Sequence, residues 1–154
     1  MGLFSFFNKK KEYFSAEEKA QIVKAIADAE MQTSGEIRVY VEGKNEFVDA
    51  IDRASELFFQ LNMQNTKNRN AVLLYLAIED RQLALFADEG IYTATGKTYW
   101  DDAVKNMIVQ FDKKNISSGV AACILQIGQT LKEKFPYDAD TDKNELPDDI
   151  VFGK

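Results

Sequence analysis

The chain of 154 residues has no histidine, one cysteine and two prolines. Without histidine it lacks the usual proton shuttle near neutral pH and a common ligand for zinc. A single cysteine cannot form an intrachain disulfide, and Cys123 lies inside an apolar helical pattern, so we expect it to be buried and inert. No stretch approaches the roughly 20 apolar residues that cross a bilayer, so no transmembrane segment is predicted. Any site must therefore rely mainly on carboxylates and other oxygen donors.

Composition divides the chain into three parts. Residues 1–14 form an apolar and basic leader, in which three phenylalanines precede a run of lysines. This charge order is the reverse of a secretory signal, and the segment suits docking on the domain, disorder or weak contact with a membrane surface. Residues 15–136 carry the periodic patterns of one domain. Residues 137–154 are acidic with few apolar groups, and we expect a flexible tail without secondary structure.

The formal net charge is −6. Such a balance repels phosphate backbones, so nucleic acid is not an expected partner. The lone cysteine gives no sign of an oxidising compartment. We therefore predict a cytoplasmic protein.

Hydrophobic periodicity predicts an α/β fold. The capping box of Ser15 and Glu18 starts the first helix. Alternation predicts a first strand, and an unbroken apolar run predicts a central second strand. We expect helices over 16–33, 50–62 and 98–111 and from Ser117, and strands over 36–42, 71–78 and 82–88. The predicted architecture is a small mixed sheet, made of a parallel β-α-β crossover and an antiparallel hairpin, covered by helices on both faces.

This topology brings distant carboxylates together. The first two strands start at the same end of the sheet, so Glu36 lies level with Asn70. The third strand runs antiparallel to the second and returns Asp88 and Glu89 to that end. Asp101 lies in the first turn of the following helix. We predict these four carboxylates as ligands of one metal site.

Converging carboxylates repel one another unless a cation, a proton or an arginine compensates them. Calcium fits best because it accepts six to eight oxygen ligands in flexible geometry, and magnesium is the second choice. The simpler alternative is structural ion pairing. Glu36 would then pair with Arg38, and Asp88 and Glu89 would pair with Arg69 or Lys97.

Several short motifs occur in an order that resembles the TPM domain, a family of thylakoid-lumen, photosystem-repair and bacterial proteins. They are Thr33-Ser34-Gly35-Glu36-Ile37-Arg38-Val39, Arg69-Asn70-Ala71-Val72-Leu73-Leu74-Tyr75, Asp80-Arg81, Asp88-Glu89-Gly90-Ile91 and Trp100. The resemblance runs from about Phe14 to Pro136. It implies a sheet sandwiched by helices, a divalent-cation site associated with calcium, and the acid phosphatase activity of plant relatives. On this resemblance the metal ligands are Glu36, Asp88 and Glu89, with Asp101 as a fourth.

Three functions stay open from the sequence. The first is a calcium-binding domain with a regulatory or structural role. The second is a metal-assisted acid phosphatase, in which Asp88 or Glu89 acts as the base and Arg38, Arg69 or Lys97 steadies the phosphate. The third is a metal-independent interaction module that grips a protein partner through its leader or its acidic tail.

Overall fold

A four-stranded mixed sheet organises the chain in the computed structural model, which describes residues 12–46, 48–111, 115–137, 146 and 149–153. The strands are β1 (Glu36–Glu42), β2 (Ala71–Ala77), β3 (Gln82–Ala87) and β4 (Ile150–Phe152), in the order β3-β2-β1-β4. Five helices lie within the described residues: α2 (Ala16–Glu30), α3 (Ala50–Gln60), α4 (Glu89–Thr95), α5 (Lys97–Phe111) and α6 (Ile116–Lys134). The predicted α/β fold is confirmed.

The strand directions also follow the prediction. β1 pairs with β2 in parallel, with α3 in the crossover, and β2 pairs with β3 as an antiparallel hairpin. The register sets Glu36 opposite Ala71, one residue from the predicted partner Asn70. β2 is buried along its whole length, as its unbroken apolar sequence requires.

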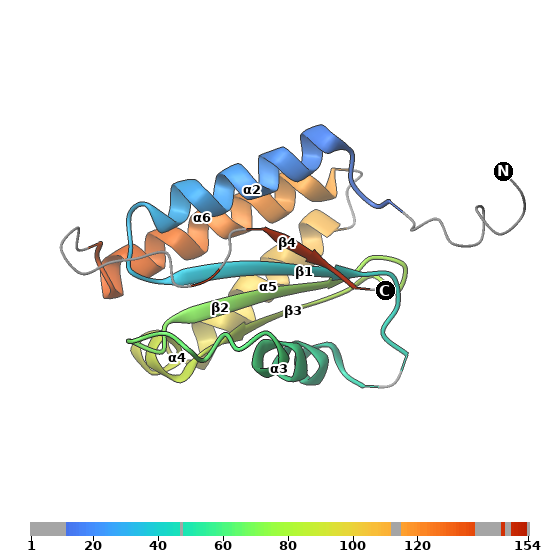
Figure 1. Cartoon of the computed structure of the whole chain (residues 1–154). Helices are drawn as coiled ribbons and strands as arrows, with labels where there is room; N and C mark the ends of the chain where they lie inside the picture. Colours follow the sequence, from blue (N-terminus) through green and yellow to red (C-terminus); the bar gives the residue numbers. More distant parts are fainter. Residues whose placement is uncertain (1–11, 47, 112–114, 138–145, 147–148, 154) are drawn as a thin grey trace, which may run out of the picture.

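Helices cover both faces of the sheet (Figure 1). On one face, α2, α5 and α6 pack on the odd-numbered residues of β1, and Ile37, Val39 and Val41 lie in this larger core. On the other face, α3 covers a smaller core that contains Phe58 and Tyr75. Alternation along β1 and β3 therefore sorts their side chains between the two cores.

Two elements are absent from the sequence-based prediction. α4 begins at Glu89, directly after Asp88, the last residue of the predicted third strand. β4 falls in the segment predicted as a tail without secondary structure, so that prediction is wrong for Ile150–Phe152, which pair in parallel with β1. An apolar run of three residues within an acidic segment is too short to predict a strand.

Some helix ends differ from the predicted ends by a few residues. The capping box is confirmed, since the Ser15 hydroxyl accepts from the Glu18 amide and the Glu18 carboxylate accepts from the Ser15 amide. α2 ends at Glu30, three residues before the predicted end, and α6 begins at Ile116 with Asn115 as its cap. No helix in the described ranges has both the length and the apolar content to cross a membrane. The predicted leader lies outside the described residues up to position 11, as does most of the acidic tail.

Candidate functional site: an acidic corner of the sheet

A row of three residues crosses the sheet where β1 and β2 begin and β3 ends: Glu36, Ala71 and Asp88. Glu36 is the partner of Ala71 on β2, and the Asp88 amide donates to the carbonyl of Ala71 at 2.9 Å. Glu36 and Asp88 are only 2% and 3% exposed. Cross-strand neighbours share a face, so the small Ala71 side chain stands between two buried carboxylates. We call Glu36, Asn70, Asp88 and Glu89 the acidic corner.

Arg69 compensates part of the negative charge of the acidic corner. Its Nε lies 2.6 Å from Oδ2 of Asp88 and its Nη2 lies 2.8 Å from Oδ1, a bidentate pair. Its Nη1 lies 3.3 Å from Oε1 of Glu89. The hydrogen bond to Asp88 raises the pKa of Arg69. The alternative of ion pairing is therefore confirmed for Asp88 and Glu89 with Arg69.

Asp88 is also the N-cap of α4, because its Oδ1 accepts from the Glu89 amide at 2.8 Å. The chain reaches this geometry through a close backbone approach. The amides of Gly90 and Ile91 both donate to the carbonyl of Arg69, whose φ is 50°. A Cβ on Gly90 would lie 2.1 Å from the Asn68 carbonyl oxygen, so only glycine fits there.

Asn70 adds an amide oxygen next to this row. Its side chain is fully buried, and its Nδ2 donates to Oγ of Ser34 at 3.2 Å. Its backbone carbonyl accepts from the Glu36 amide at 3.4 Å. The Oδ1 atom has no hydrogen-bond partner among the described residues. A buried amide oxygen without a donor is costly, and it is also an available ligand for a hard cation.

Asp101 has a different environment from the other predicted ligands. Its Oδ2 lies 2.9 Å from Nζ of Lys97, one turn earlier on α5, and both side chains are exposed. This contact raises the pKa of Lys97. Within the described ranges, no three histidine, cysteine, aspartate or glutamate side chains converge as a ready-made metal site. The acidic corner brings its oxygen donors near one another without assembling them around a central point.

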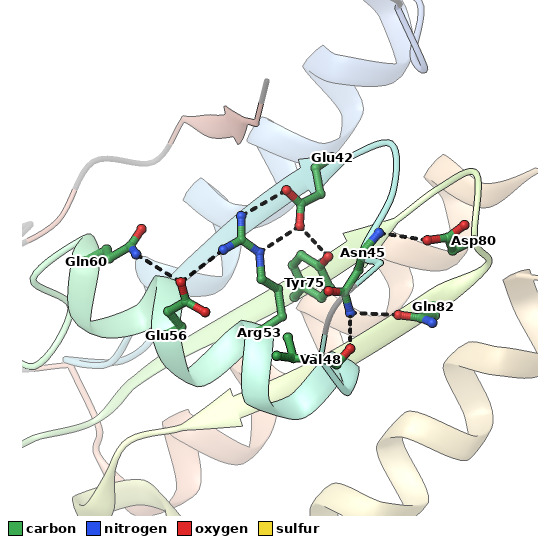
Figure 2. Close-up of polar contacts among 9 residues, drawn as sticks. All are labelled: Glu42, Asn45, Val48, Arg53, Glu56, Gln60, Tyr75, Asp80 and Gln82. Atoms are coloured by element: carbon green, nitrogen blue, oxygen red, sulfur yellow. Dashed lines mark hydrogen bonds and ion pairs between the residues drawn. The ribbon is translucent and has the colours of Figure 1, made fainter.

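A second polar cluster lies at the opposite end of β1, and Figure 2 shows its contacts. The Glu42 carboxylate accepts from Arg53 at 2.9 and 3.0 Å and from the hydroxyl of Tyr75. Burial, followed by the Glu42 hydrogen bond, raises the pKa of Tyr75, and the Glu42 hydrogen bond raises that of Arg53. Sequence reasoning missed this cluster. The parallel register sets Tyr40 beside Tyr75, and Glu42 follows two residue pairs later on the same face of the sheet.

A cavity of about 500 Å³ opens beside this cluster, between the end of β1 and the start of α3. Its lining includes Glu42, Lys44 and Arg53. The Nη1 of Arg53 also lies 3.4 Å from Oε1 of Glu56. The buried charges here satisfy one another, which is typical of a structural ion pair.

Further polar contacts lie at this end of the sheet. Asp80 lies at the opposite end of the sheet from Asp88, as the hairpin requires, and its Oδ2 accepts from the Asn45 amide at 2.7 Å. The Asn45 side chain donates to Gln82 and to the carbonyl of Val48 (Figure 2). These bonds hold the segment between β1 and α3 in place.

Comparisons with known proteins agree with this architecture. The BA42 protein of the psychrophilic bacterium Bizionia argentinensis is 41% identical, with a TM-score of 0.86 over 94% of this chain and 99% of that one. The N-terminal domain of the cg2496 protein of Corynebacterium glutamicum shares the fold, with a TM-score of 0.61, 16% identity, and coverage of 80% of this chain and 84% of that chain. No curated protein matches the chain. The model of the TPM domain matches residues 7–130. The chain therefore belongs to the TPM domain family.

Proposed function

We propose that the acidic corner binds a divalent cation, with calcium as the preferred ion and magnesium as the second choice. The observation that carries this proposal is the row of buried Glu36, Ala71 and Asp88, with the unpartnered Oδ1 of Asn70 in the adjacent position. The two carboxylates flank the small side chain of Ala71.

Charge supports the same conclusion. Two carboxylates of the acidic corner, Asp88 and Glu89, share the single guanidinium of Arg69. A cation would add positive charge beside these carboxylates, and the buried position of Glu36 and Asp88 reduces screening by solvent.

The donor set suits a hard ion. Carboxylate and amide oxygens are the ligands that calcium prefers, and calcium accepts irregular geometry more readily than magnesium does. Glu36, Asp88, Glu89 and the Oδ1 of Asn70 would hold the ion, and Asp101 stays a predicted fourth carboxylate. Both oxygens of Asp88 contact Arg69, so binding has to displace or share that guanidinium. We therefore expect weak affinity, in the range of about 10⁻⁴ to 10⁻³ M.

The role that follows is structural or regulatory. A cation at the acidic corner would tie the start of β1 to the end of β3 and to the first residue of α4. Binding only the folded state raises stability by mass action. Of the three cations predicted to steady a phosphate, Arg69 and Lys97 are paired with carboxylates, so the cation-binding role is the one we propose.

The test is a thermal melt of the native chain in 10 mM calcium and in chelator. For a dissociation constant of about 1 mM, calcium should raise the midpoint by about 3 °C. Asp88→Asn, which can retain the cap of α4 but loses the charge, should abolish most of this shift. Arg69→Gln should enlarge it, because the competing guanidinium is gone.

Asp102→Asn is the matched control, since Asp102 is an exposed acidic residue next to Asp101 and is outside the proposed donor set. It should leave the calcium shift unchanged. An equal shift in the native chain and in Asp88→Asn would place calcium elsewhere and refute the proposal.

A further inference from the structure

α4 joins the acidic corner to the start of α5. The chain enters α4 directly from β3 through Asp88 and leaves it through Gly96, which precedes α5. In Figure 1 this helix lies at the end of the sheet where β1 and β2 begin. A helix of seven residues has few internal hydrogen bonds and is marginal in isolation. Its order therefore depends on the contacts that hold its two ends.

The first turn of α4 shares its hydrogen bonds with the acidic corner. Oδ1 of Asp88 accepts from the Glu89 amide and from Nη2 of Arg69, both at 2.8 Å. The amides of Gly90 and Ile91 donate to the Arg69 carbonyl at 2.8 and 3.3 Å. The oxygen that caps α4 is thus one of the oxygens that we propose as cation ligands. Any change in the position of this turn changes the acidic corner as well.

The last turn of α4 is bonded to α5 through Thr95. The Thr95 hydroxyl donates to the carbonyl of Ile91 at 3.0 Å, and its Oγ1 accepts from Nε1 of Trp100 at 2.8 Å. Trp100 is 5% exposed and packs in the larger core. A buried indole N–H needs an acceptor, and Thr95 supplies it. Trp100 therefore depends on the position of α4.

Ile91 links the two ends. Its side chain is fully buried, its amide donates to the Arg69 carbonyl, and its carbonyl accepts from the Thr95 hydroxyl. A continuous series of hydrogen bonds thus runs from Arg69 through Ile91 and Thr95 to the indole of Trp100. Bonds in such a series form and break more cooperatively than isolated ones.

The exit from α4 has room to move. Gly96 has a φ of 84°, and a Cβ at this position would meet no heavy atom within 4 Å in the described part of the chain. The left-handed conformation favours glycine, and the open space lets the backbone pivot there. Gly90 and the β-branched residues of α4 also lower its helix propensity. Short elements of this kind open locally at a lower free energy than the core does.

We propose that α4 couples the cation site to Trp100, and that Thr95 is the positioning residue through which the coupling acts. This inference rests on the proposed function, because the cation acts on α4 through Asp88 and Glu89. When α4 opens, Glu89 leaves the acidic corner and the Asp88 carboxylate loses its contact with the Glu89 amide. A bound cation therefore holds α4 closed. With a dissociation constant of about 1 mM, 10 mM calcium should lower the opening equilibrium by about elevenfold.

Hydrogen exchange followed by NMR on the full-length chain tests the coupling. Trp100 is the single tryptophan, so its indole N–H gives one resolved signal. Exchange of this proton and of the Tyr92 and Gly96 amides should be about tenfold slower in 10 mM calcium than in chelator. The Arg53 amide, at the opposite end of the sheet, is the internal control and should change by less than about twofold. Equal slowing at Arg53 would overturn the proposal, because calcium would then stabilise the whole fold without a separate opening of α4.

Two variants test the role of Thr95. Thr95→Val removes the hydroxyl, so the indole N–H should lose its calcium response while calcium still raises the melting midpoint. Thr95→Ser restores the hydroxyl and should restore the response. A full indole response in Thr95→Val would overturn the assigned role of Thr95. Circular dichroism and a cooperative melt establish that both variants are folded.

The native chain separates this inference from the proposed function, whether or not the variants fold. A calcium-dependent rise in the melting midpoint without slower exchange at Tyr92, Gly96 and Trp100 would overturn the coupling and leave the cation site in place. Neither a rise nor slower exchange would refute both.

Discussion

Arg69 decides how the carboxylates of the acidic corner are compensated. It pairs with Asp88 through two nitrogens and with Glu89 through the third. It can do so because its backbone adopts a left-handed φ of 50° just before β2. Hydrophobic periodicity carries no information about such a conformation, which is why the sequence left metal binding and ion pairing as alternatives for the same carboxylates.

The buried ion pair of Glu42 and Arg53 offers a test at the same scale. Arg53→Met should lower the free energy of unfolding by about 3 kcal/mol, because it leaves a buried carboxylate with only the Tyr75 hydroxyl as a partner. Urea denaturation measures the loss. The control Glu56→Gln removes only the exposed partner of Arg53 and should cost less than about 1 kcal/mol. Equal losses would show that Glu42 is not desolvated.

Cys123 should be chemically silent in the folded protein. Its side chain is buried, and burial raises the pKa of the thiol to about 12 from an ordinary value of 9.0. A thiol reagent at pH 8 should therefore react at least about a hundredfold more slowly with the native chain than with the chain in denaturant. Comparable rates would contradict the predicted burial.

The same shift predicts a loss of stability at alkaline pH. A pKa that is higher in the folded state contributes stability that is complete below pH 9 and is lost as the pH rises through 12. Melting midpoints between pH 8 and 11.5 should fall less steeply in Cys123→Ala than in the native chain. Part of the decline should persist in the variant, since burial also raises the pKa of Tyr13 to about 12.

At the scale of elements, α2 and α6 lie side by side on one face of the sheet (Figure 1). Their contact depends on small residues. A Cβ on Gly128 of α6 would lie 2.5 Å from the Cβ and 3.1 Å from the Cα of Ala29 on α2. The two helices therefore approach as closely as a glycine allows.

Gly128→Ala should destabilise the protein by about 1 to 3 kcal/mol, because the gain in helix propensity is smaller than the cost of separating packed helices. Chemical denaturation measures the change. Ala122→Ser, at an exposed position on the same helix, should change stability by less than about 0.5 kcal/mol. Stabilisation by Gly128→Ala would mean that α2 and α6 move apart freely.

Elements with long periodic patterns were predictable, and short ones were not. The alternation of β1 and the apolar run of β2 fixed their residues and their parallel pairing, since a helical crossover leaves almost no other choice. α4 escaped prediction because its seven residues include Gly90 and three β-branched residues, which disfavour a helix. β4 was not predicted because its pairing with the distant strand β1 defines it, and no local sequence pattern does.

At the scale of the whole molecule, the topology places a cluster of charged side chains at each end of the sheet. One end has the ion pair of Glu42 and Arg53, in which buried charges are matched. The other has the acidic corner, in which Asp88 and Glu89 share Arg69. The sequence predicted which carboxylates return to one end from strand direction alone, but their distance from Arg69 depends on loop geometry that only the structure provides.

A calcium titration followed by ¹H–¹⁵N NMR tests the cation site most directly. We expect the amides of Glu36, Ala71 and Asp88 to shift most, and to shift together with one dissociation constant. Asp88→Asn should show no such response. Spectra that stay unchanged up to 10 mM calcium, or shifts confined to the acidic residues after Tyr137, would contradict a cation site at the acidic corner.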